Sequence, residues 1–301
     1  MQRPSFLKYP FAWLIFIFLQ ILALLPYRLL LTIGSGIGKF VLFLLSSRKK
    51  VALTNLQVCF PDLPEEQRKF LLKKNISETG IMFTQTLKAF LGNTTKIESN
   101  AIIEGGEHIE RCLQDKKGIL LVAGHFTALD MGGKILCKKY PIAGMYRPHK
   151  HPVTEYIVTQ SRLKYATHMF KRDELRPIIK HLKQGKILWY APDQDYRRGQ
   201  SVFVPFFNRP AATIVATHQL ARLSDCEVLF FHVQRNPKPP YYTLKISEPL
   251  PDFPTKDAII DTTRINLGIE NMVKQCPEQY LWVHKRFKTT PDRVKNPYNL
   301  P

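Results

Sequence analysis

The sequence predicts an α/β domain with a largely parallel central sheet flanked by helices, joined to an N-terminal transmembrane anchor helix and membrane-proximal helices. From about residue 96, short aliphatic and aromatic runs alternate with helical segments, which is typical of a parallel sheet covered by helices. Before that region, nineteen uncharged residues separate Lys8 from Arg28, close to the roughly 20 apolar residues that cross a bilayer. The 301 residues are 45% hydrophobic, enough for a full core.

The apolar run near the N-terminus reads "FAWLIFIFLQILALL". A cleaved signal peptide is the alternative, but more apolar sequence follows the run and no cleavage site of small residues is visible, so an uncleaved anchor is favoured. Lysine and arginine are more frequent after the run than before it, which places the rest of the chain in the cytoplasm. The later stretch "FVLFLLSS" is too short to span and favours a helix lying in the membrane interface.

The chain divides into two expected regions. Residues 1–47 form a membrane anchor and interfacial segment, and residues 48–301 form the main domain, with a helical lead-in over 48–95 and an α/β core over 96–301. In the lead-in, "PDLPEE" predicts a turn followed by an acidic helix start. The apolar stripe of the next helix, with its spacings of three and four, could face either the core or lipid.

The charge and the cysteines limit the class of protein. The formal net charge of +20 attracts polyanions such as nucleic acid, anionic lipid or an acidic carrier protein, and the apolar N-terminus favours a membrane setting. The five cysteines are scattered without a CxxC pair or a metal-ligand spacing. The sequence therefore predicts neither a disulfide framework nor a metal site, and the main domain belongs in a reducing compartment.

Within the core, apolar runs predict buried strands, and the segments between them predict helices. The expected strands cover residues 118–123, 141–146, 186–191, 227–233 and 241–247. The expected helices cover residues 127–139, 152–165, 174–184, 211–223 and 256–275. The loop at 236–242 indicates a hairpin or a short crossover at the edge of the sheet.

The stretch "GHFTALD" places His125 at the carboxyl end of an expected strand and Asp130 in the first turn of the next helix. Enzymes built on parallel sheets carry their chemistry at this edge. A carboxylate that holds one imidazole nitrogen leaves the other free to take a proton from an alcohol. No G-x-S-x-G nucleophile elbow is present, so the attacking hydroxyl would belong to a substrate. The alternative is a plain helix start, capped by Thr127, with His125 only filling the strand end.

Several further motifs occur in order along the chain. They are "RKKVALTNLQVCFPDLPEEQR" at 48–68, "GHFTALDMGG" at 124–133, "MYRPHKHP" at 145–152, "FKRDELRPIIKHLKQGKILWYAPDQDY" at 170–196, "SVFVPFF" at 201–207 and "PEQYLWVHKRFK" at 277–288. Together with the N-terminal anchor, they resemble the lipid A secondary acyltransferases of Gram-negative bacteria. These are the late lauroyl and myristoyl transferases of the lysophospholipid acyltransferase superfamily.

The resemblance implies an enzyme that moves a fatty acyl chain from acyl carrier protein, or less often coenzyme A, to a hydroxyl of a lipid A precursor. It places this reaction at the cytoplasmic face of the inner membrane. The uncharged N-terminal run predicts a single pass, and no bound cofactor is expected. His125 and Asp130 occupy the H-x4-D/E positions of the catalytic dyad. Glutamate is common where Asp130 stands, and this departure makes the acceptor less certain. Backbone amides near the turn or an arginine could stabilise the oxyanion, and Arg162, which resembles a recurring arginine of the family, is the first side chain to test.

The remaining candidate residues lie in or beside the matching motifs. The expected substrate-binding residues are Arg147, Arg172, Asp193, Asp195, Arg197 and Arg198, because guanidinium groups suit phosphates and the two aspartates could orient them. The expected wall of the acyl pocket is Val204, Pro205, Phe206 and Phe207, with ordinary core as the alternative. The expected partners are acyl carrier protein, the lipid A precursor and inner-membrane lipids, without nucleic acid.

Two other functions stay open at this point. An acyltransferase acting on a lysophospholipid or an aminolipid would share the dyad. A non-catalytic basic membrane protein that binds anionic lipid or nucleic acid would explain the charge and the anchor, but not the histidine. The length of the transferred chain depends on pocket depth, which spacing along a sequence does not give.

Overall fold

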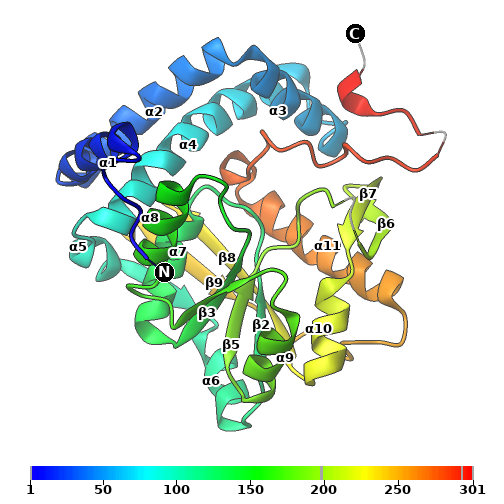
Figure 1. Ribbon diagram of the computed structural model, residues 1–301. Helices are drawn as coiled ribbons and strands as arrows, with labels where there is room; N and C mark the ends of the chain where they lie inside the picture. The colour runs from blue at the N-terminus through cyan, green and yellow to red at the C-terminus, as the bar shows by residue number, and fades with distance from the viewer. Residues whose placement is uncertain (1, 197–198, 293, 300–301) are drawn as a thin grey trace.

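The structure is a computed structural model that describes residues 2–196, 199–292 and 294–299 (Figure 1). Its strands are β1 (Ala101–Glu104), β2 (Ile119–Val122), β3 (Ile142–Tyr146), β4 (His168–Lys171), β5 (Ile187–Tyr190), β6 (Ser201–Phe206), β7 (Arg209–Ile214), β8 (Glu227–Arg235) and β9 (Tyr242–Ile246). Its helices are α1 (Pro10–Ala23), α2 (Tyr27–Leu44), α3 (Ser46–Cys59), α4 (Glu65–Leu91), α5 (Thr95–Glu98), α6 (Gly106–Gln114), α7 (Leu129–Lys139), α8 (Pro152–Arg162), α9 (Leu175–Lys183), α10 (Ala216–Ser224) and α11 (Ala258–Gln275), with the 3-10 turns η1 (Pro277–Gln279) and η2 (Pro297–Asn299).

A seven-stranded sheet in the order β1-β9-β8-β2-β5-β3-β4 forms the centre of the molecule. Every neighbouring pair runs parallel except β8 and β9, which are antiparallel. The largely parallel sheet predicted from the sequence is therefore confirmed. Of the two predicted connections between β8 and β9, the structure has the hairpin. The hairpin does not lie at the edge of the sheet, because β1 pairs with the outer side of β9.

The five predicted strands are present, and the predicted helix over 211–223 is partly wrong. Residues up to Ile214 form β7, and helix α10 begins only at Ala216. The reason is a tight turn at Phe207 and Asn208, which both have positive φ (50° and 58°) and fold β7 back on β6 as an antiparallel pair. Strands β1 and β4 were not expected, because they lie at the two edges of the sheet, are partly exposed and lack the buried apolar run of β2 and β5.

The core has two layers, one on each face of the sheet. Leu120 and Val122 of β2 lie in a cluster with residues of α9, α10 and α11. Ile119 and Leu121, which point to the opposite face, lie in a cluster with residues of α6 and α7. Helices therefore cover both faces, and β2 is buried on both sides as a central parallel strand requires (Figure 1).

Helix α4 carries the N-terminal helices on the outside of this domain (Figure 1). Its stripe, including Leu72 and Ile76, is buried, which confirms the core alternative for these positions. Helix α2 packs on α4 at close range, since a Cβ on Gly80 would lie 2.1 Å from the carbonyl oxygen of Gly34. The division of the chain at residue 47 remains a prediction.

The helix suited to a membrane is not the one expected. Helix α1, which holds the predicted anchor run, has 14 residues, or roughly 21 Å, short of the roughly 30 Å hydrocarbon core. In the described part of the chain, one helix, the 18-residue α2, is long and apolar enough to cross a bilayer by length and composition. The sequence pattern missed it because Arg28 and Lys39 interrupt the apolar run, whereas the backbone continues as one helix.

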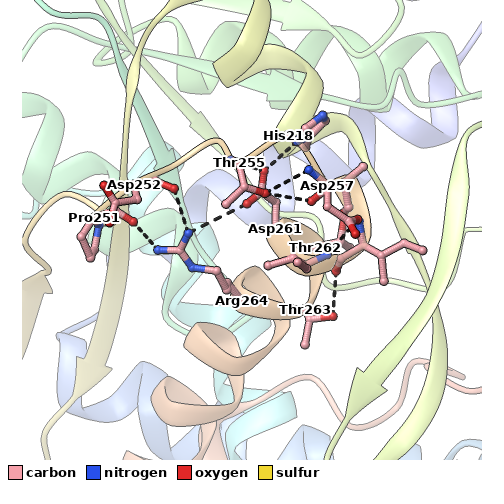
Figure 2. A network of polar contacts seen from close by, with 12 residues as sticks. His218, Pro251, Asp252, Thr255, Asp257, Asp261, Thr262, Thr263 and Arg264 are labelled. Carbon is pink, nitrogen blue, oxygen red and sulfur yellow. Dashed lines mark hydrogen bonds and ion pairs between the residues drawn. The ribbon is translucent and has the colours of Figure 1, made fainter.

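A buried polar network ties α10, α11 and the loop before α11 together. Figure 2 shows His218, Thr255 and Arg264 gathered around the carboxylate of Asp261. His218 Nδ1 lies 2.7 Å from one carboxylate oxygen, and the Thr255 amide donates to the same oxygen at 2.8 Å. Asp261 is fully buried. Its charge is thus held in the interior only by these partners.

We expect Asp261→Ala to lower the free energy of unfolding by about 2–6 kcal/mol, because it leaves His218 Nδ1 and the Thr255 amide without their partner, at about 1–3 kcal/mol each. Asp257→Ala is the matched control on the same helix. Asp257 caps α11 through the amide of Ile259 at 2.7 Å, and loss of such a cap costs about 1 kcal/mol. Chemical denaturation of both variants measures the difference, and equal losses would show that the network adds nothing beyond a local cap.

Candidate active site

His125 and Asp193 meet at the carboxyl edge of the central sheet. His125 lies in the loop between β2 and α7, and Asp193 lies three residues after β5. Strands β2 and β5 are parallel neighbours, with Val122 opposite Tyr190, so both strands deliver their following loops to the same edge. This pairing brings together two side chains that are 68 residues apart in the sequence.

The contact between the two side chains is close and doubly fixed. His125 Nδ1 lies 2.5 Å from Asp193 Oδ1, and the His125 backbone amide donates to Asp193 Oδ2 at 2.8 Å. The hydroxyl of Tyr280 donates to Asp193 Oδ2 at 2.8 Å. The side chain of His125 is 30% exposed, whereas that of Asp193 is 1% exposed. The imidazole is thus anchored on its inner side, and its ring keeps an accessible face.

The electrostatics favour an ionised aspartate beside a basic imidazole. Burial alone would raise the pKa of Asp193, but the charge and hydrogen bonds of His125, with the hydroxyl of Tyr280, lower it to about 2. Burial opposes the charged imidazolium, yet the Asp193 carboxylate outweighs it and raises the pKa of His125 above its usual value. Because the carboxylate accepts from Nδ1, that nitrogen keeps its proton and Nε2 is the basic atom.

The segment 277–282 fixes the backbone of the loop that carries His125. Its Leu281 amide donates to the His125 carbonyl at 3.0 Å, and the Gln279 carbonyl accepts from the Thr127 amide at 2.7 Å. Two buried asparagines bind this segment and the residues just after it. Asn75 of α4 donates to the carbonyl of Tyr280, and Asn55 of α3 donates to the carbonyls of Trp282 and His284. The helical lead-in is therefore part of the site's framework.

Sequence reasoning missed Tyr280, Asn55 and Asn75. The only signal was that Tyr280 and Asn55 fall within the motifs at 277–288 and 48–68. Spacing gave no indication, because all of these contacts join residues distant in the chain.

The expected hydrogen bond between His125 and Asp130 is replaced by another pairing. Asp130 Oδ1 accepts from Arg162 Nε at 2.9 Å and from Nη2 at 2.8 Å, and Thr86 lies 3.4 Å from Oδ2. Asp130 sits in the first turn of α7, where it faces α8 and reaches Arg162 more directly than the loop histidine. Both side chains still lie close enough to act on the pKa of His125: the charge of Arg162 lowers it and the charge of Asp130 raises it.

The alternative of a plain capped helix start is not what the structure has. Helix α7 begins at Leu129 after Ala128, without a side-chain cap, and the Thr127 hydroxyl has no hydrogen-bond partner among the described residues. His125 does more than fill a strand end, because its ring nitrogen bonds to a buried carboxylate.

An apolar cavity lies beside Asp130 and Arg162. It lies between α7, the end of α8 and strands β3, β4, β5 and β8, and its space of about 480 Å³ is partly open to solvent. Its wall includes Leu136, Cys137, Gly144, Met169 and Trp189. Asp130 and Arg162, which border the cavity, lie near enough to His125 for their charges to act on its pKa, so this side of the cavity lies towards the imidazole. A lining of this kind suits an apolar ligand.

The four residues expected to form the acyl pocket lie elsewhere. Val204, Phe206 and Phe207 are buried in the core beside Trp282 and Phe287, and Pro205 is exposed on β6. None of the four lines the apolar cavity. The ordinary-core alternative therefore describes the position of Val204, Phe206 and Phe207, but not that of Pro205.

The expected substrate-binding residues are placed unequally. Arg147 and Arg172 are exposed just after β3 and β4, at the same edge of the sheet as His125. Asp195 holds no arginine in the described part of the chain: its carboxylate accepts from the amide and hydroxyl of Thr289, at 2.9 and 3.0 Å. Arg197 and Arg198 fall outside the described residues.

The cysteines and potential metal ligands offer no second chemistry here. Burial raises the pKa of Cys137, which borders the cavity, to about 12, so its thiol stays protonated. Among the described residues, no group of three histidine, cysteine, aspartate or glutamate side chains could hold a metal ion. The arrangement as a whole can accept a proton at His125 Nε2 from a hydroxyl beside an apolar cavity.

The chain matches known proteins over nearly its whole length. The family model described as bacterial lipid A biosynthesis acyltransferase matches residues 2–289. The lipid A biosynthesis lauroyltransferase of Escherichia coli (strain K12) is 36% identical over 97% of this chain and 95% of that protein. The lipid A biosynthesis palmitoleoyltransferase of the same organism is 33% identical over 94% of each chain.

Among solved structures, the 1-acyl-sn-glycerophosphate acyltransferase PlsC from Thermotoga maritima aligns with a TM-score of 0.38 at 16% identity, over 77% of this chain and 96% of that one. The family resemblance seen in the sequence motifs is confirmed by the family model and the full-length relatives. Because the family model and both relatives cover nearly the whole chain, the chain belongs to the bacterial lipid A biosynthesis acyltransferases and is an acyltransferase.

Proposed function

We propose that this protein transfers a fatty acyl chain from acyl carrier protein to a hydroxyl of a lipid A precursor. The observation that carries the proposal is the imidazole of His125, held by the buried Asp193 carboxylate within a chain related throughout to lipid A acyltransferases. A thioester donor needs a base for the attacking alcohol and a stabiliser for the oxyanion. Coenzyme A carries the same thioester and is the alternative donor.

The transfer follows from the residues in hand. His125 Nε2 takes the proton of the acceptor hydroxyl as its oxygen bonds to the thioester carbonyl carbon, and the Asp193 carboxylate stabilises the resulting imidazolium. The tetrahedral intermediate then expels the donor thiolate, which receives the proton from Nε2. The ester product, the free thiol of the donor and the neutral histidine remain, so no co-reactant is required.

We assign the stabilisation of the oxyanion to Arg162. Two hydrogen bonds to Asp130 fix its guanidinium, and the nearby carboxylate, working against burial, raises its pKa. In this scheme Asp130 is a positioning residue that acts through Arg162 rather than through the imidazole. Arg147 and Arg172, exposed at the same edge, are suited to phosphates of the acceptor or of the donor's phosphopantetheine arm.

The fatty tail would occupy the apolar cavity under α7. Gly133 lies in its wall, and a Cβ built on this glycine meets no atom within 4 Å, so the space beside it is free. A side chain at position 133 would therefore project into the cavity and shorten it.

We expect Gly133→Leu to shift the donor preference towards shorter acyl chains. Leucine would displace roughly two methylenes of the tail at about 0.8 kcal/mol each, so transfer of the longest chain that the native enzyme uses should fall roughly tenfold or more. Gly133→Ala is the matched control and should change the preference little. Rates with a ladder of acyl-acyl carrier proteins measure the effect, and a uniform loss at all lengths would place the tail elsewhere.

The proposed location is the cytoplasmic face of the bacterial inner membrane, with one pass through the bilayer. The apolar helices α1 and α2 support membrane association. A cysteine placed at the N-terminus and labelled by an impermeant maleimide in intact cells would test the single pass.

The test of function supplies purified protein with labelled acyl-acyl carrier protein and, in turn, a lipid A precursor, a lysophospholipid and an aminolipid. Transfer to the lipid A precursor is the expected result. Transfer to a lysophospholipid or an aminolipid alone would show that the proposed acceptor is wrong. Absence of transfer to all three acceptors would contradict the proposed reaction. Mass spectrometry of lipid A from a deletion strain, with one acyl group missing, is the cellular counterpart.

A further inference from the structure

A second concave surface lies behind the segment 277–282, on the side of the N-terminal helices. It is a groove that encloses about 1470 Å³, part of it open to solvent, between α2, α3, α4 and the loop after β8. Four lysines line it: Lys39, Lys49, Lys73 and Lys74. They come from three different helices, so the fold gathers them from separate parts of the chain. We call this surface the lysine groove.

The charge of the lysine groove is not balanced from within. The groove also contains Arg235, but Arg235 is paired with Glu78 in its wall. In the part of the chain that the structure describes, the four lysines take part in no recorded ion pair, and all four are exposed. With Arg235 against Glu78 and Glu278, the lining carries a net charge of +3. The lysine groove is therefore suited to an anion, and ammonium groups bind phosphate as point charges.

The same groove has an apolar side, formed largely by α2. Leu42, Phe43 and Ile76 line it, and Phe43 is 80% exposed. Phe43 and Leu42 belong to α2, the helix long and apolar enough to cross a bilayer. On the same helix Phe40 is also exposed. The lysines thus stand next to a surface suited to acyl chains.

We propose that the lysine groove binds an anionic phospholipid of the membrane, with the phosphate on the lysines and the chains against α2. The combination of converging cations with an adjoining apolar helix matches an amphiphile with a charged head. An acidic soluble protein would satisfy the lysines but would leave the exposed ring of Phe43 uncovered. The acceptor glycolipid also carries phosphate groups, and the experiment below distinguishes its binding from that of an anionic phospholipid.

Binding in the lysine groove would also support the catalytic edge. The side chain of Gln279, in the wall of the groove, accepts from the Arg235 amide and donates to the Arg235 carbonyl, both at 2.8 Å. The Gln279 carbonyl holds the Thr127 amide, and the next residue, Tyr280, donates to Asp193. A bound lipid would thus steady the segment that positions the imidazole.

The experiment uses the full chain in a non-ionic detergent and counts bound lipids by native mass spectrometry. Short-chain phosphatidylglycerol and phosphatidylcholine are titrated in parallel into the native protein, into Lys73→Gln with Lys74→Gln, and into Lys180→Gln with Lys183→Gln. The control pair is exposed on α9, at the opposite end of the domain from α2 (Figure 1), and it removes the same charge. Binding is measured without turnover, so the outcome is independent of the proposed acyl transfer.

The native protein should bind phosphatidylglycerol at least tenfold more tightly than phosphatidylcholine. Each lysine beside an anionic lipid contributes roughly a factor of five, so the Lys73 and Lys74 variant should lose roughly 25-fold in affinity and the control less than twofold. Equal binding by both variants would overturn the proposal. Acyl carrier protein and the isolated glycolipid acceptor are titrated into the same variants, and the proposal also fails if only one of these two, and not phosphatidylglycerol, distinguishes the Lys73 and Lys74 variant from the control.

Discussion

His125→Ala should abolish acyl transfer almost completely, by roughly 10²–10⁴-fold in kcat, while the protein still folds. The imidazole is the only group at this edge that we assign to proton transfer, and a positioned general base contributes about that factor. Its side chain is partly exposed, so its removal opens no closed cavity in the core. Transfer from labelled acyl-acyl carrier protein measures the loss, and thermal unfolding followed by circular dichroism verifies the fold.

The matched control for this variant is His168→Gln. His168 lies exposed on the edge strand β4, so its replacement should leave transfer within about twofold of the native rate. Substantial transfer by folded His125→Ala would remove the general base from the mechanism. It would favour instead the alternative of a basic membrane protein without chemistry at this site.

Asp193→Asn should reduce kcat by roughly 10³–10⁴-fold and also move the acid limb of the pH–rate profile. An amide at this position can orient the ring in the wrong tautomer and cannot stabilise the imidazolium, and the equivalent change in a serine protease triad costs about 10⁴. The base works when His125 is neutral, so native activity rises as pH increases through the raised pKa of His125. Without the carboxylate, burial dominates and lowers that pKa, so the limb shifts to lower pH.

The pH profile distinguishes this role from a merely structural one. A variant that only loosens the fold would lower activity at every pH and leave the acid limb in place. Asp225→Asn is the control, because Asp225 is exposed, pairs only with Lys117 among the described residues, and lies at the far end of the sheet from the imidazole. If Asp193→Asn kept the native acid limb, Asp193 would not be the group that sets the pKa of His125.

The two aspartates of the site show what spacing along the chain can and cannot predict. The pattern "GHFTALD" correctly placed a histidine at a strand end and an aspartate at a helix start, because both positions follow from local sequence. It could not predict which of the two carboxylates bonds to the imidazole of His125. Asp130 turned to Arg162 of α8, and Asp193 arrived from the neighbouring strand, although both residues were already candidates.

A similar limit applies to the cavity and to the N-terminal helices. The run "VPFF" has the composition expected of a fatty-acid pocket, but the turn at Phe207 and Asn208 folds it into a hairpin against the core. The cavity is lined instead by residues from α7 and four strands, so no single stretch of sequence describes it. Close packing of Gly34 and Gly80 likewise sets how α2 lies on α4, and hydropathy alone does not contain that contact.

The sequence by itself determined the α/β class, the largely parallel sheet, the strand end that carries the imidazole and the family to which the chain belongs. These follow from periodicity and motif order, which are local properties of the chain. The tertiary structure alone decided which carboxylate orients His125, where an apolar cavity opens and which lysines converge behind the site. These depend on strand order and helix packing, which bring together residues that the sequence keeps far apart.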